Sequence, residues 1–465
     1  MRELPKAKTI FEPFRIKMVE PLHQLSLQER QEALKKAHFN LFALPAESVT
    51  FDLLTDSGTS AMSSSQWAAM MIADESYAGA KSFYHFEKVI QDLTRLKHVI
   101  PTHQGRSAEY LLMKATLKPG QYVLGNTHFD TTRANIESSG AHAIDLPCKE
   151  NEDSSTLEPF KGNIDLVALK QFLMDHPGQV AFVIMTITNN SVGGQPVSLQ
   201  NMRGAAEICQ GYKVPLFIDC ARFAENSYFI KTREAGQSHR SVKSIAQELF
   251  SYASGAMMSA KKDAFGNIGG FLAVKEDGLA EVLRRLMVIT EGFPTYGGLA
   301  GRDLEALAVG LVEVLDENYL AYRLRSVEYF GRALDELGYQ TVKPWGGHAV
   351  YIDAGRTLPH LPALQYPGQS LSVALYEHIG IRSVEVGSVM LGHRHSETGV
   401  ETPAPKELVR LAMPRRVYTQ SHVDYMLEMS GYLKPYLSEL SGYRITKQPQ
   451  YLRHFTCEFE PLPKP

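Results

Sequence analysis

The stretch MMSAKKD (257–263) and the run VPLFID (214–219) decide the predicted fold class. Both begin with a short, continuously apolar segment, as the buried strands of a mostly parallel sheet do. Similar segments lie at 121–125, 141–146, 180–187 and 271–274, and stretches with helical periodicity, such as 199–211, separate them. This alternation predicts an α/β protein with a large, doubly wound, mostly parallel sheet.

Polar residues stand where these two predicted strands end. Asp219 closes one run and Arg222 follows it, while Ser259 and Lys262 close the other. Taken singly, a lysine pair is usually solvated surface and a strand-end aspartate is usually a cap. In this order, however, the residues suit pyridoxal phosphate (PLP). That cofactor needs an aspartate at its pyridinium nitrogen, a lysine for its Schiff base, and hydroxyl or arginine groups for its phosphate.

The composition is that of an ordinary globular protein. The chain has 465 residues, of which 44% are apolar and 21% charged, which suits about two or three domains. A formal charge of −3 gives no indication of a nucleic-acid partner.

The 4 cysteines form no C-x-x-C pair, so we expect reduced thiols and a cytoplasmic protein. No apolar run approaches the roughly 18 residues of a membrane span, and the N-terminus lacks a signal-peptide core.

The pattern along the chain predicts an arm and two domains. Residues 1–20 are punctuated by proline, and we expect them to pack on another body such as a partner subunit. Residues 50–334 carry the strand–helix alternation and form the predicted large domain. A smaller α+β domain is predicted from 21–49 together with 335–465.

Three helical regions frame the smaller domain. Residues 26–43 are predicted to be helical, with Ser26 as N-cap and Glu29 in the capping-box position. Residues 301–338 are predicted to form one long helix or two abutting ones that end at Gly338. The remainder carries predicted strands at 347–352 and 408–413 and a closing helix near 421–437.

Several loops between these elements are rich in ligand-binding groups. THQGR (102–106) places Gly105 and Arg106 before a helical stretch, where backbone N–H groups and a guanidinium would bind an anion, although an ordinary helix start has the same pattern. Phe129 could stack on an aromatic cofactor, although an isolated phenylalanine is more often a core residue. Other polar segments are TDSGTS (55–60), DESYAG (74–79) and NNSVGGQPVS (189–198), the last after a buried strand.

Together with longer strings, these motifs resemble the β-eliminating lyases. The matching strings are LLTDSGT, DESYAG, PTHQGR, GGQPVS, D-x-A-R-F-A-E-N-x-Y-F-I-K, MSAKKD, GFPTYGGL and LRHFT, and they run in the same order over roughly residues 11–456. The resemblance implies a fold-type-I PLP-dependent transferase-like architecture. It also implies a homotetramer with active sites at subunit interfaces, and cleavage of an amino acid to pyruvate and ammonium.

The resemblance assigns the cofactor site residue by residue. Lys262 matches the Schiff-base lysine, Asp219 the partner of the pyridine nitrogen, and Arg222 a residue near the phenolic oxygen. Phe129 matches the ring stacked on PLP. The phosphate cradle matches Gln104, Gly105, Arg106 and Ser259.

The resemblance also assigns the substrate and cation sites. Thr55, Ser57, Asn190 and Arg410 match the group that holds the substrate α-carboxylate, and Asn190 also borders the cofactor. Tyr77 matches a catalytic tyrosine. Gly58, Glu75 and Asn267 match the ligands of an activating monovalent cation, usually K⁺; oxygen donors suit such a hard cation.

Two branches of the family release different rings, indole from tryptophan or phenol from tyrosine. The connection 115–125 and the strings PRRVYT and GLAGRD resemble the tyrosine branch. The pocket positions favour tryptophan instead. Val386 stands where the tyrosine branch has an arginine for the phenol hydroxyl, and Asp130 replaces its threonine. His454 stands where the tyrosine branch has the first phenylalanine of a Phe-Phe pair. An indole N–H donates only, and Asp130 is an acceptor.

Some positions depart from the family pattern without removing a catalytic group, namely Ser107, Cys220 and His128. A tyrosine phenol-lyase type of reaction remains the main alternative. A cysteine-type C–S lyase would also use Lys262, Asp219 and Arg410 but would not need Asp130 or His454. A non-catalytic binding protein is the third alternative, and the intact Lys262, Tyr77 and Arg410 argue against it.

Overall fold

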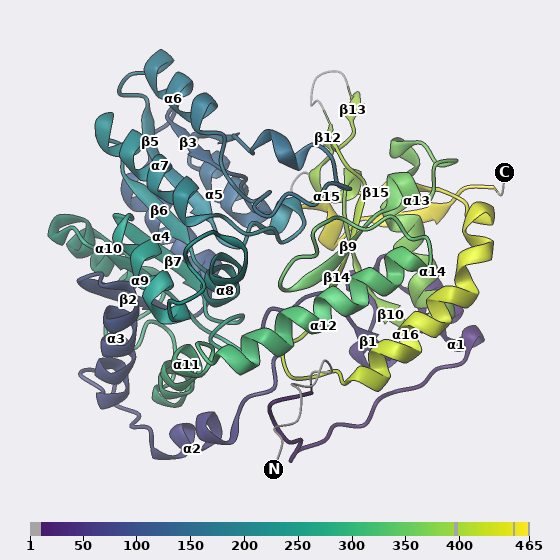
Figure 1. The fold of residues 1–465 in the computed structure, drawn as a ribbon, viewed down its shortest axis with the longest axis horizontal. Coiled ribbons are helices and arrows are strands. Elements are labelled where there is room, and N and C mark those ends of the chain that lie inside the picture. Colours follow the sequence, from purple (N-terminus) through teal and green to yellow (C-terminus); the bar gives the residue numbers. More distant parts are fainter. Residues whose placement is uncertain (1–10, 395–398, 450–451, 464–465) are drawn as a thin grey trace, which may run out of the picture.

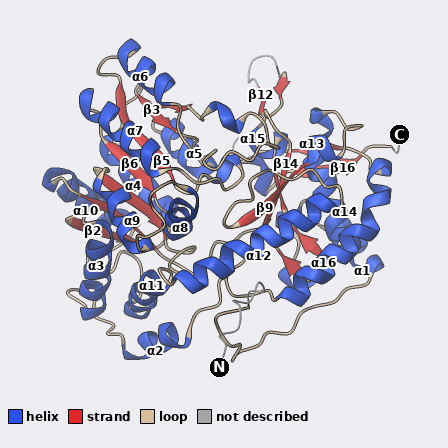
Figure 2. Cartoon of the chain, in the orientation of Figure 1, coloured by secondary structure: helices blue, strands red, loops and turns tan. Residues whose placement is uncertain are grey.

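The computed structural model describes residues 11–394, 399–449 and 452–463, and it shows two domains bridged by a long helix (Figures 1 and 2). The large domain contains a seven-stranded sheet in the order β2-β8-β7-β6-β5-β3-β4. β8 is antiparallel to both neighbours, and the remaining pairs are parallel. The strands are β2 (His98–Thr102), β3 (Tyr122–Gly125), β4 (His142–Asp145), β5 (Val180–Thr186), β6 (Leu216–Asp219), β7 (Gly255–Ser259) and β8 (Gly270–Val274). The predicted mostly parallel sheet is thus confirmed.

The six strands predicted from apolar runs are all present, whereas β2 was not predicted. β2 carries Pro101, which removes a backbone donor and makes a strand hard to recognise in sequence. β2 is an edge strand of the sheet, and edge strands tolerate proline because one side of the strand needs no backbone partner.

Helices cover both faces of this sheet, as a doubly wound fold requires. One face packs on α4 (Gly105–Thr116), α5 (Asp130–Ser138) and α10 (Asp277–Thr290). The opposite face packs on α3 (Lys81–Thr94), α6 (Leu166–Asp175), α7 (Leu199–Gly211), α8 (Phe223–Arg233), α9 (Val242–Ser251) and α11 (Gly301–Glu313). α2 (Ser64–Ile72) lies against α11 at the lower edge of Figure 1.

The smaller domain is built on a three-stranded antiparallel sheet in the order β11-β14-β9. These strands are β9 (Ala349–Asp353), β11 (Val384–Val386) and β14 (Leu408–Ala412). Its helices are α1 (Leu27–Lys36), α13 (Ala354–Thr357), α14 (Pro367–Ile379), α15 (Ser388–Leu391) and α16 (Gln420–Leu433). Three strand pairs complete it: β1 (Phe51–Asp52) with β10 (Ile381–Arg382), β12 (His393–Arg394) with β13 (Glu401–Thr402), and β15 (Tyr443–Lys447) with β16 (Glu458–Pro461).

Helix α12 (Glu317–Glu336) belongs to both hydrophobic cores. Leu320 near its start packs in the core of the large domain, whereas Phe330 packs in that of the smaller one. The predicted region 301–338 therefore consists of two helices, α11 and α12. They are separate because Asp316 caps the start of α12 through the backbone N–H of Asn318 and Tyr319. A helix so anchored at both ends fixes the two domains relative to each other.

Residues 26–43 form a shorter helix than predicted. The capping box of Ser26 and Glu29 is confirmed, but α1 ends at Lys36. His38 and Phe39 then take positive φ angles of 49° and 58°, which no α-helix accommodates. A 3₁₀ turn, Leu41–Ala43, follows.

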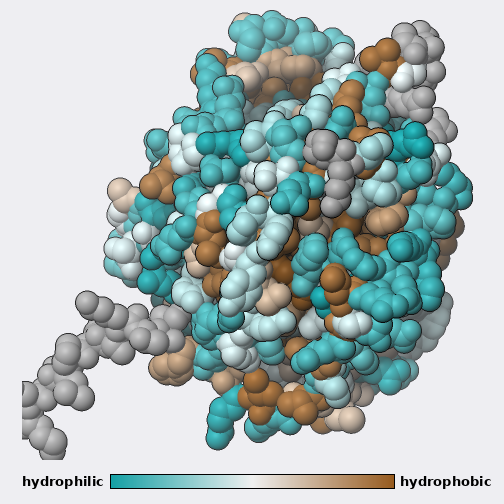
Figure 3. All heavy atoms as spheres, turned by 90° about the vertical axis from the view of Figure 1, so that its right-hand side faces the viewer, coloured by the Kyte–Doolittle hydropathy of each residue, from teal (hydrophilic) through white to brown (hydrophobic). Residues whose placement is uncertain are grey.

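No helix among the described residues is long and apolar enough to cross a membrane. The face of the smaller domain that is turned toward the viewer in Figure 3 is a mosaic in which small hydrophobic areas are separated by hydrophilic ones. The carboxyl ends of β3, β5, β6 and β7 meet at one edge of the large sheet, because these strands are parallel. In open α/β sheets this edge is where ligands bind.

Candidate active site

A cavity of about 260 Å³ lies at this edge of the sheet, between the two domains. It brings together residues that are far apart in sequence and that were predicted to bind cofactor or substrate. The predicted residues in its wall are Thr55, Ser57, Gln104, Gly105, Arg106, Phe129, Asp130, Asn190, Asp219, Arg222, Ser259, Lys262, Arg410 and His454. Val386, Tyr77, Gly58, Glu75 and Asn267 are not in the wall.

Lys262 and Asp219 are a buried amine and a buried carboxylate at the ends of neighbouring strands. Lys262 follows β7, and burial, aided by Arg222, lowers the pKa of its ammonium to about 8. Asp219 is the last residue of β6, and burial raises the pKa of its carboxyl group. A buried carboxylate is stabilised by a nearby cation, which the protonated ring nitrogen of PLP would provide. The pair therefore fits that cofactor.

A close approach between α4 and β7 forms the predicted phosphate cradle. Gly105 is the first residue of α4, and a Cβ atom there would lie 2.7 Å from Cβ of Ser259. Only glycine lets the helix start come this near to the strand end. The first N–H groups of α4, together with Arg106 and the Ser259 hydroxyl, form a site that suits a phosphate dianion.

Arg410 and Asn190 form a second polar group in the cavity wall. Arg410 donates from Nη1 to Oδ1 of Asn190 at 3.1 Å and from Nη2 to the Leu54 carbonyl at 3.0 Å. The same Asn190 oxygen accepts the hydroxyl of Tyr351 at 2.8 Å and lies 2.9 Å from Nε2 of His348. With its oxygen so engaged, the amide nitrogen of Asn190 is the end available to a ligand.

Two buried polar atoms beside this group have no partner among the described residues. They are Nε of Arg410 and the hydroxyl of Thr188, and both residues line the cavity. Buried donors without partners are costly in a finished structure. A bound ligand with oxygen acceptors, such as an amino-acid carboxylate or the cofactor, would satisfy them.

Asp130 and His454 face each other in the cavity wall. Nε2 of His454 lies 3.2 Å from Oδ2 of Asp130, and both side chains are almost fully buried. Neither ring nitrogen of His454 has a hydrogen-bond partner among the residues that the structure describes. Phe42 and Phe455 pack around the imidazole, with ring centroids 5.8 and 4.0 Å from it.

Val386, the residue expected to disfavour a phenol, does not itself line the cavity. Val384 and Met390 form the wall there, and Val386 shares their apolar cluster. No arginine occupies position 386, and the surroundings are apolar. Val386 packs with the lining residues Val384 and Met390, and its contact with the substrate stays a prediction.

Arg222 is held by a residue that was not singled out from the sequence. It donates from Nε and Nη2 to the two carboxylate oxygens of Asp56 at 3.0 and 2.8 Å. These bonds leave Nη1 as the nitrogen that can reach a ligand in the cavity.

Glu109 is a further cavity residue that the sequence did not reveal. It is buried and accepts the hydroxyls of Thr131 and Thr132 at 2.9 and 3.0 Å. Burial, together with the nearby Asp219, raises the pKa of its carboxyl group to about 7. The one signal in the sequence is that Glu109 follows Gly105 by four residues, which puts both residues on the same side of α4.

The predicted cation ligands and Tyr77 lie outside the cavity. Asn267 donates its amide to the Gly58 carbonyl at 3.0 Å, so these two residues are together. Glu75 instead accepts the N–H of Gly301 at 3.0 Å, at the start of α11. Tyr77 is 71% exposed and packs on Phe293 and Tyr296. A single chain therefore brings together two of the three proposed cation ligands and leaves the tyrosine at the surface.

An α/β sheet with a buried lysine and aspartate at its strand ends suits a PLP-dependent enzyme, and comparison with known proteins identifies the family. The model of the β-eliminating lyase family matches residues 52–429. This chain belongs to the β-eliminating lyase family.

Curated relatives match almost the whole chain. The tryptophanase of Salinibacter ruber is 57% identical over 97% of this chain and 96% of its own length. That of Hyphomonas neptunium is 56% identical, over 98% of this chain and 100% of its own length. The tyrosine phenol-lyase of Clostridium tetani is 46% identical over 97% of this chain and 98% of its own length.

Solved structures confirm the predicted fold at low sequence identity. A serine palmitoyltransferase of Sphingomonas wittichii superimposes with a TM-score of 0.59 at 12% identity, covering 88% of this chain and 96% of that one. A threonine aldolase of Leishmania major gives a TM-score of 0.57 at 14% identity, covering 83% and 99%. The large-and-small-domain architecture expected for fold type I is therefore present.

Proposed function

We propose that this chain catalyses the PLP-dependent β-elimination of L-tryptophan, releasing indole, pyruvate and ammonium. The observation that carries the proposal is the buried Asp130 beside His454, in an aromatic and aliphatic end of the cavity. An indole ring presents one N–H donor on an apolar body, so a single buried acceptor in such surroundings suits it. The higher identity to the two tryptophanases than to the tyrosine phenol-lyase supports this choice.

The cavity residues divide between the parts of the cofactor. Lys262 would hold the aldehyde carbon and Asp219 the ring nitrogen, while Phe129 would pack on the ring face. The phosphate would lie at the start of α4, against Gln104, Gly105, Arg106 and Ser259. When bound, PLP supplies an electron-withdrawing ring that stabilises negative charge at the substrate Cα.

The substrate would be oriented by its α-carboxylate. Arg410 offers an Nε that no described residue bonds, and Asn190 offers its amide nitrogen. Thr55 and Ser57 add hydroxyls to the same wall. Lys262 would then take the proton from Cα. A base with a pKa of about 8 is well matched to proton transfer near neutral pH.

The indole ring must gain a proton at its attachment carbon before it leaves, which requires a general acid within about 3 Å. We propose that Tyr77 supplies this proton to the cavity of a neighbouring subunit in a homotetramer. The exposure of Tyr77 in a single chain supports this arrangement.

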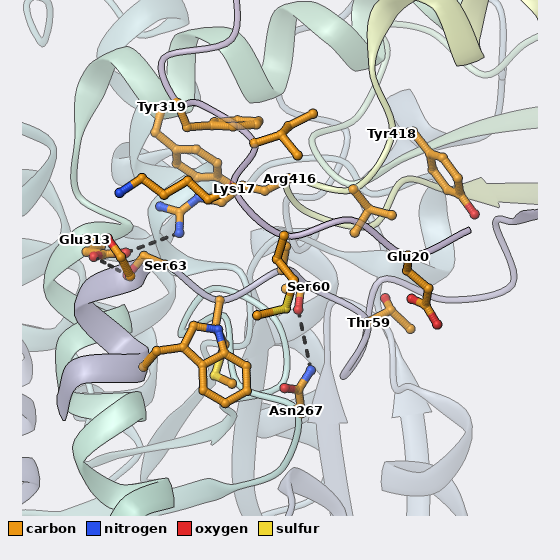
Figure 4. Close-up of a pocket in the computed structure, with 18 of the residues that line it drawn as sticks. Lys17, Glu20, Thr59, Ser60, Ser63, Asn267, Glu313, Tyr319, Arg416 and Tyr418 are labelled. Carbon is orange, nitrogen blue, oxygen red and sulfur yellow. Dashed lines mark hydrogen bonds and ion pairs between the residues drawn. The ribbon is translucent and has the colours of Figure 1, made fainter. Parts of the chain in front are cut away.

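The N-terminal arm supports assembly as well. Residues 11–25 run in extended form along the lower side of the molecule in Figure 1, and a groove of about 1810 Å³ lies between the arm and the body. Figure 4 shows arm residues Lys17 and Glu20 across this groove from Ser63 and Asn267. Large apolar side chains of the arm are exposed, including Phe11, Met18 and Val19. A second subunit would bury such residues.

We further propose that a monovalent cation binds where the subunits meet. Gly58 and Asn267 lie together at the groove and contribute oxygen atoms, and Glu75 of another copy would complete the ligand set. Four buried cysteines without disulfides are consistent with the proposed cytoplasmic location.

Product analysis tests the reaction. The protein, loaded with PLP and K⁺, would be incubated separately with tryptophan, tyrosine and S-methylcysteine, and indole, phenol and methanethiol would be quantified. We expect indole release far faster than phenol release. Faster phenol release would identify a tyrosine phenol-lyase, thiol release alone a C–S lyase, and PLP binding without any product a non-catalytic protein.

A further inference from the structure

The string PRRVYT (414–419) contains an arginine that is completely buried. Arg415 is 0% exposed and follows β14, the strand that carries Arg410. The next residue, Arg416, turns to the groove shown in Figure 4, where it pairs with Glu313 at 3.2 Å. The two adjacent arginines thus have different surroundings, and the function proposed above uses neither.

Arg415 binds three carboxylates from three separate segments. Its Nη1 donates to Oδ2 of Asp56 at 2.9 Å, and its Nη2 donates to Oε1 of Glu225 and Oδ1 of Asp263, each at 2.9 Å. Asp56 lies in the loop after β1, Glu225 in α8, and Asp263 directly after Lys262. A planar guanidinium with several donors is the side chain that can join three such groups.

Two of these carboxylates, Asp56 and Asp263, are also tied to segments next to the active-site wall. Asp56 stands between Thr55 and Ser57 and receives both bonds from Arg222. Asp263 accepts the backbone N–H of Ala224 through its second oxygen at 2.8 Å, which ties the turn after Lys262 to the start of α8.

The cluster contains as many arginines as carboxylates. Arg323 donates to the same Glu225 oxygen at 3.1 Å, so three arginines (Arg222, Arg323 and Arg415) meet three carboxylates. Such a buried network is costly to desolvate and is weak evidence for stability, whereas a role in fixing geometry would explain its position.

We propose that Arg415 is a positioning residue of the proposed lyase: through Asp263 and Asp56 it fixes Lys262, Arg222 and the Thr55–Ser57 loop relative to Arg410. The inference rests on the proposed function, because that function assigns Lys262 and the carboxylate-binding Arg410 to the same reaction. The smaller domain provides Arg410 and Arg415 from one strand and the turn after it. The guanidinium of Arg415 therefore sets the spacing between the substrate carboxylate and the amine that takes the Cα proton.

The test compares Arg415→Lys with Arg444→Lys, the same change at an exposed arginine that pairs with Glu460 and lines neither the cavity nor the groove. Lysine keeps the charge but offers one compact ammonium that cannot span three carboxylates. We expect Arg415→Lys to lower kcat at least about tenfold with little change in KM, because small misplacements of reacting groups have effects of this size. It should also slow PLP uptake by the cofactor-free protein at least about tenfold, because Lys262 would be misplaced. Arg444→Lys should stay within about twofold of wild type in both kcat and uptake.

Uptake of PLP, followed by absorbance, needs no substrate. A wild-type protein that takes up PLP but does not cleave tryptophan would therefore refute the proposed function, and the uptake rates would still decide the role of Arg415. An Arg415→Lys protein with wild-type uptake and kcat would overturn the inference, even if its Tm fell.

Asp263→Asn covers the case in which Arg415→Lys does not fold. It keeps the shape of the side chain but only one oxygen acceptor, so it cannot accept from both Ala224 and Arg415. We expect the same loss of uptake and kcat, and wild-type values would overturn the inference. If both variants fold, a double-mutant cycle should show that their effects are not additive, since the two residues act as one unit.

Discussion

Nε2 of His454 lies 3.2 Å from Oδ2 of Asp130, although 324 residues of sequence separate them and neither belongs to the sheet that carries the lysine. Oδ1 of Asp130 accepts the N–H of Thr131 at 2.6 Å, which orients the carboxylate at the start of α5. Oδ2 is therefore the oxygen that remains for an indole N–H, and the imidazole lies beside it. This relationship makes the substrate specificity testable by one substitution.

Asp130→Ala should lower kcat/KM for tryptophan at least about tenfold, because losing a buried hydrogen bond to a charged acceptor costs roughly 1.5–3 kcal/mol. The same variant should retain its activity on S-methylcysteine, whose leaving group needs no ring protonation. Steady-state kinetics with both substrates makes the measurement. An equal loss on both would show that Asp130 supports the fold or the cofactor instead of the indole.

The clustering of the proposed cofactor residues in one cavity could be predicted from sequence because they follow strand ends. Asp219 and Ser259 terminate β6 and β7, and parallel neighbours must bring such residues to one edge. Glu109 was missed because its role depends on the rotation of α4, which a single sequence does not fix. The burial of His454 by Phe42 and Phe455 likewise depends on tertiary packing, and only the family resemblance pointed to it.

Lys262 should capture PLP with a pH dependence centred near 8. Its folded-state pKa is depressed by burial, so the nucleophilic neutral amine predominates above about pH 8, well below the usual range for lysine. Uptake by the cofactor-free protein should therefore rise with pH through that midpoint and level off above it. Stopped-flow absorbance between pH 6.5 and 9.5 would measure it.

Neighbouring Lys261 provides the control. After borohydride reduction, the covalent PLP adduct should be absent in Lys262→Ala and present in Lys261→Ala. Mass-spectrometric mapping of an adduct to any other lysine of the wild-type protein would contradict the assignment, as would a midpoint near 10.

Gly105→Ala should weaken PLP binding by about tenfold or more, because the new Cβ would come within 2.7 Å of Cβ of Ser259 and displace the start of α4. Gly211→Ala is the matched control, since a Cβ there meets nothing within 4 Å. Equilibrium titration of both variants with PLP gives the two affinities. An unchanged Kd in Gly105→Ala would show that the phosphate lies elsewhere.

K⁺ should activate the enzyme through Gly58, Asn267 and Glu75. Activity measured at equal ionic strength in K⁺, Na⁺ and tetramethylammonium should be highest in K⁺ and lowest in the organic cation, which is too large and too weakly coordinated by oxygen. Glu75→Gln should reduce this selectivity, because it removes the only formal negative charge among the three ligands. Equal rates in all three salts would refute the cation site.

Tyr77 and Lys262 should act in the same active site from different subunits. In one chain Tyr77 lies at the surface beside Phe293 and Tyr296, whereas Lys262 lines the cavity. Tyr77→Phe and Lys262→Ala should each be inactive on tryptophan. When the two variants are mixed and allowed to exchange subunits, some cavities combine an intact lysine with an intact tyrosine. Random exchange at equal concentrations predicts recovery of about a quarter of the wild-type activity. If both groups came from one chain, each cavity would lack one of them and mixing would restore nothing.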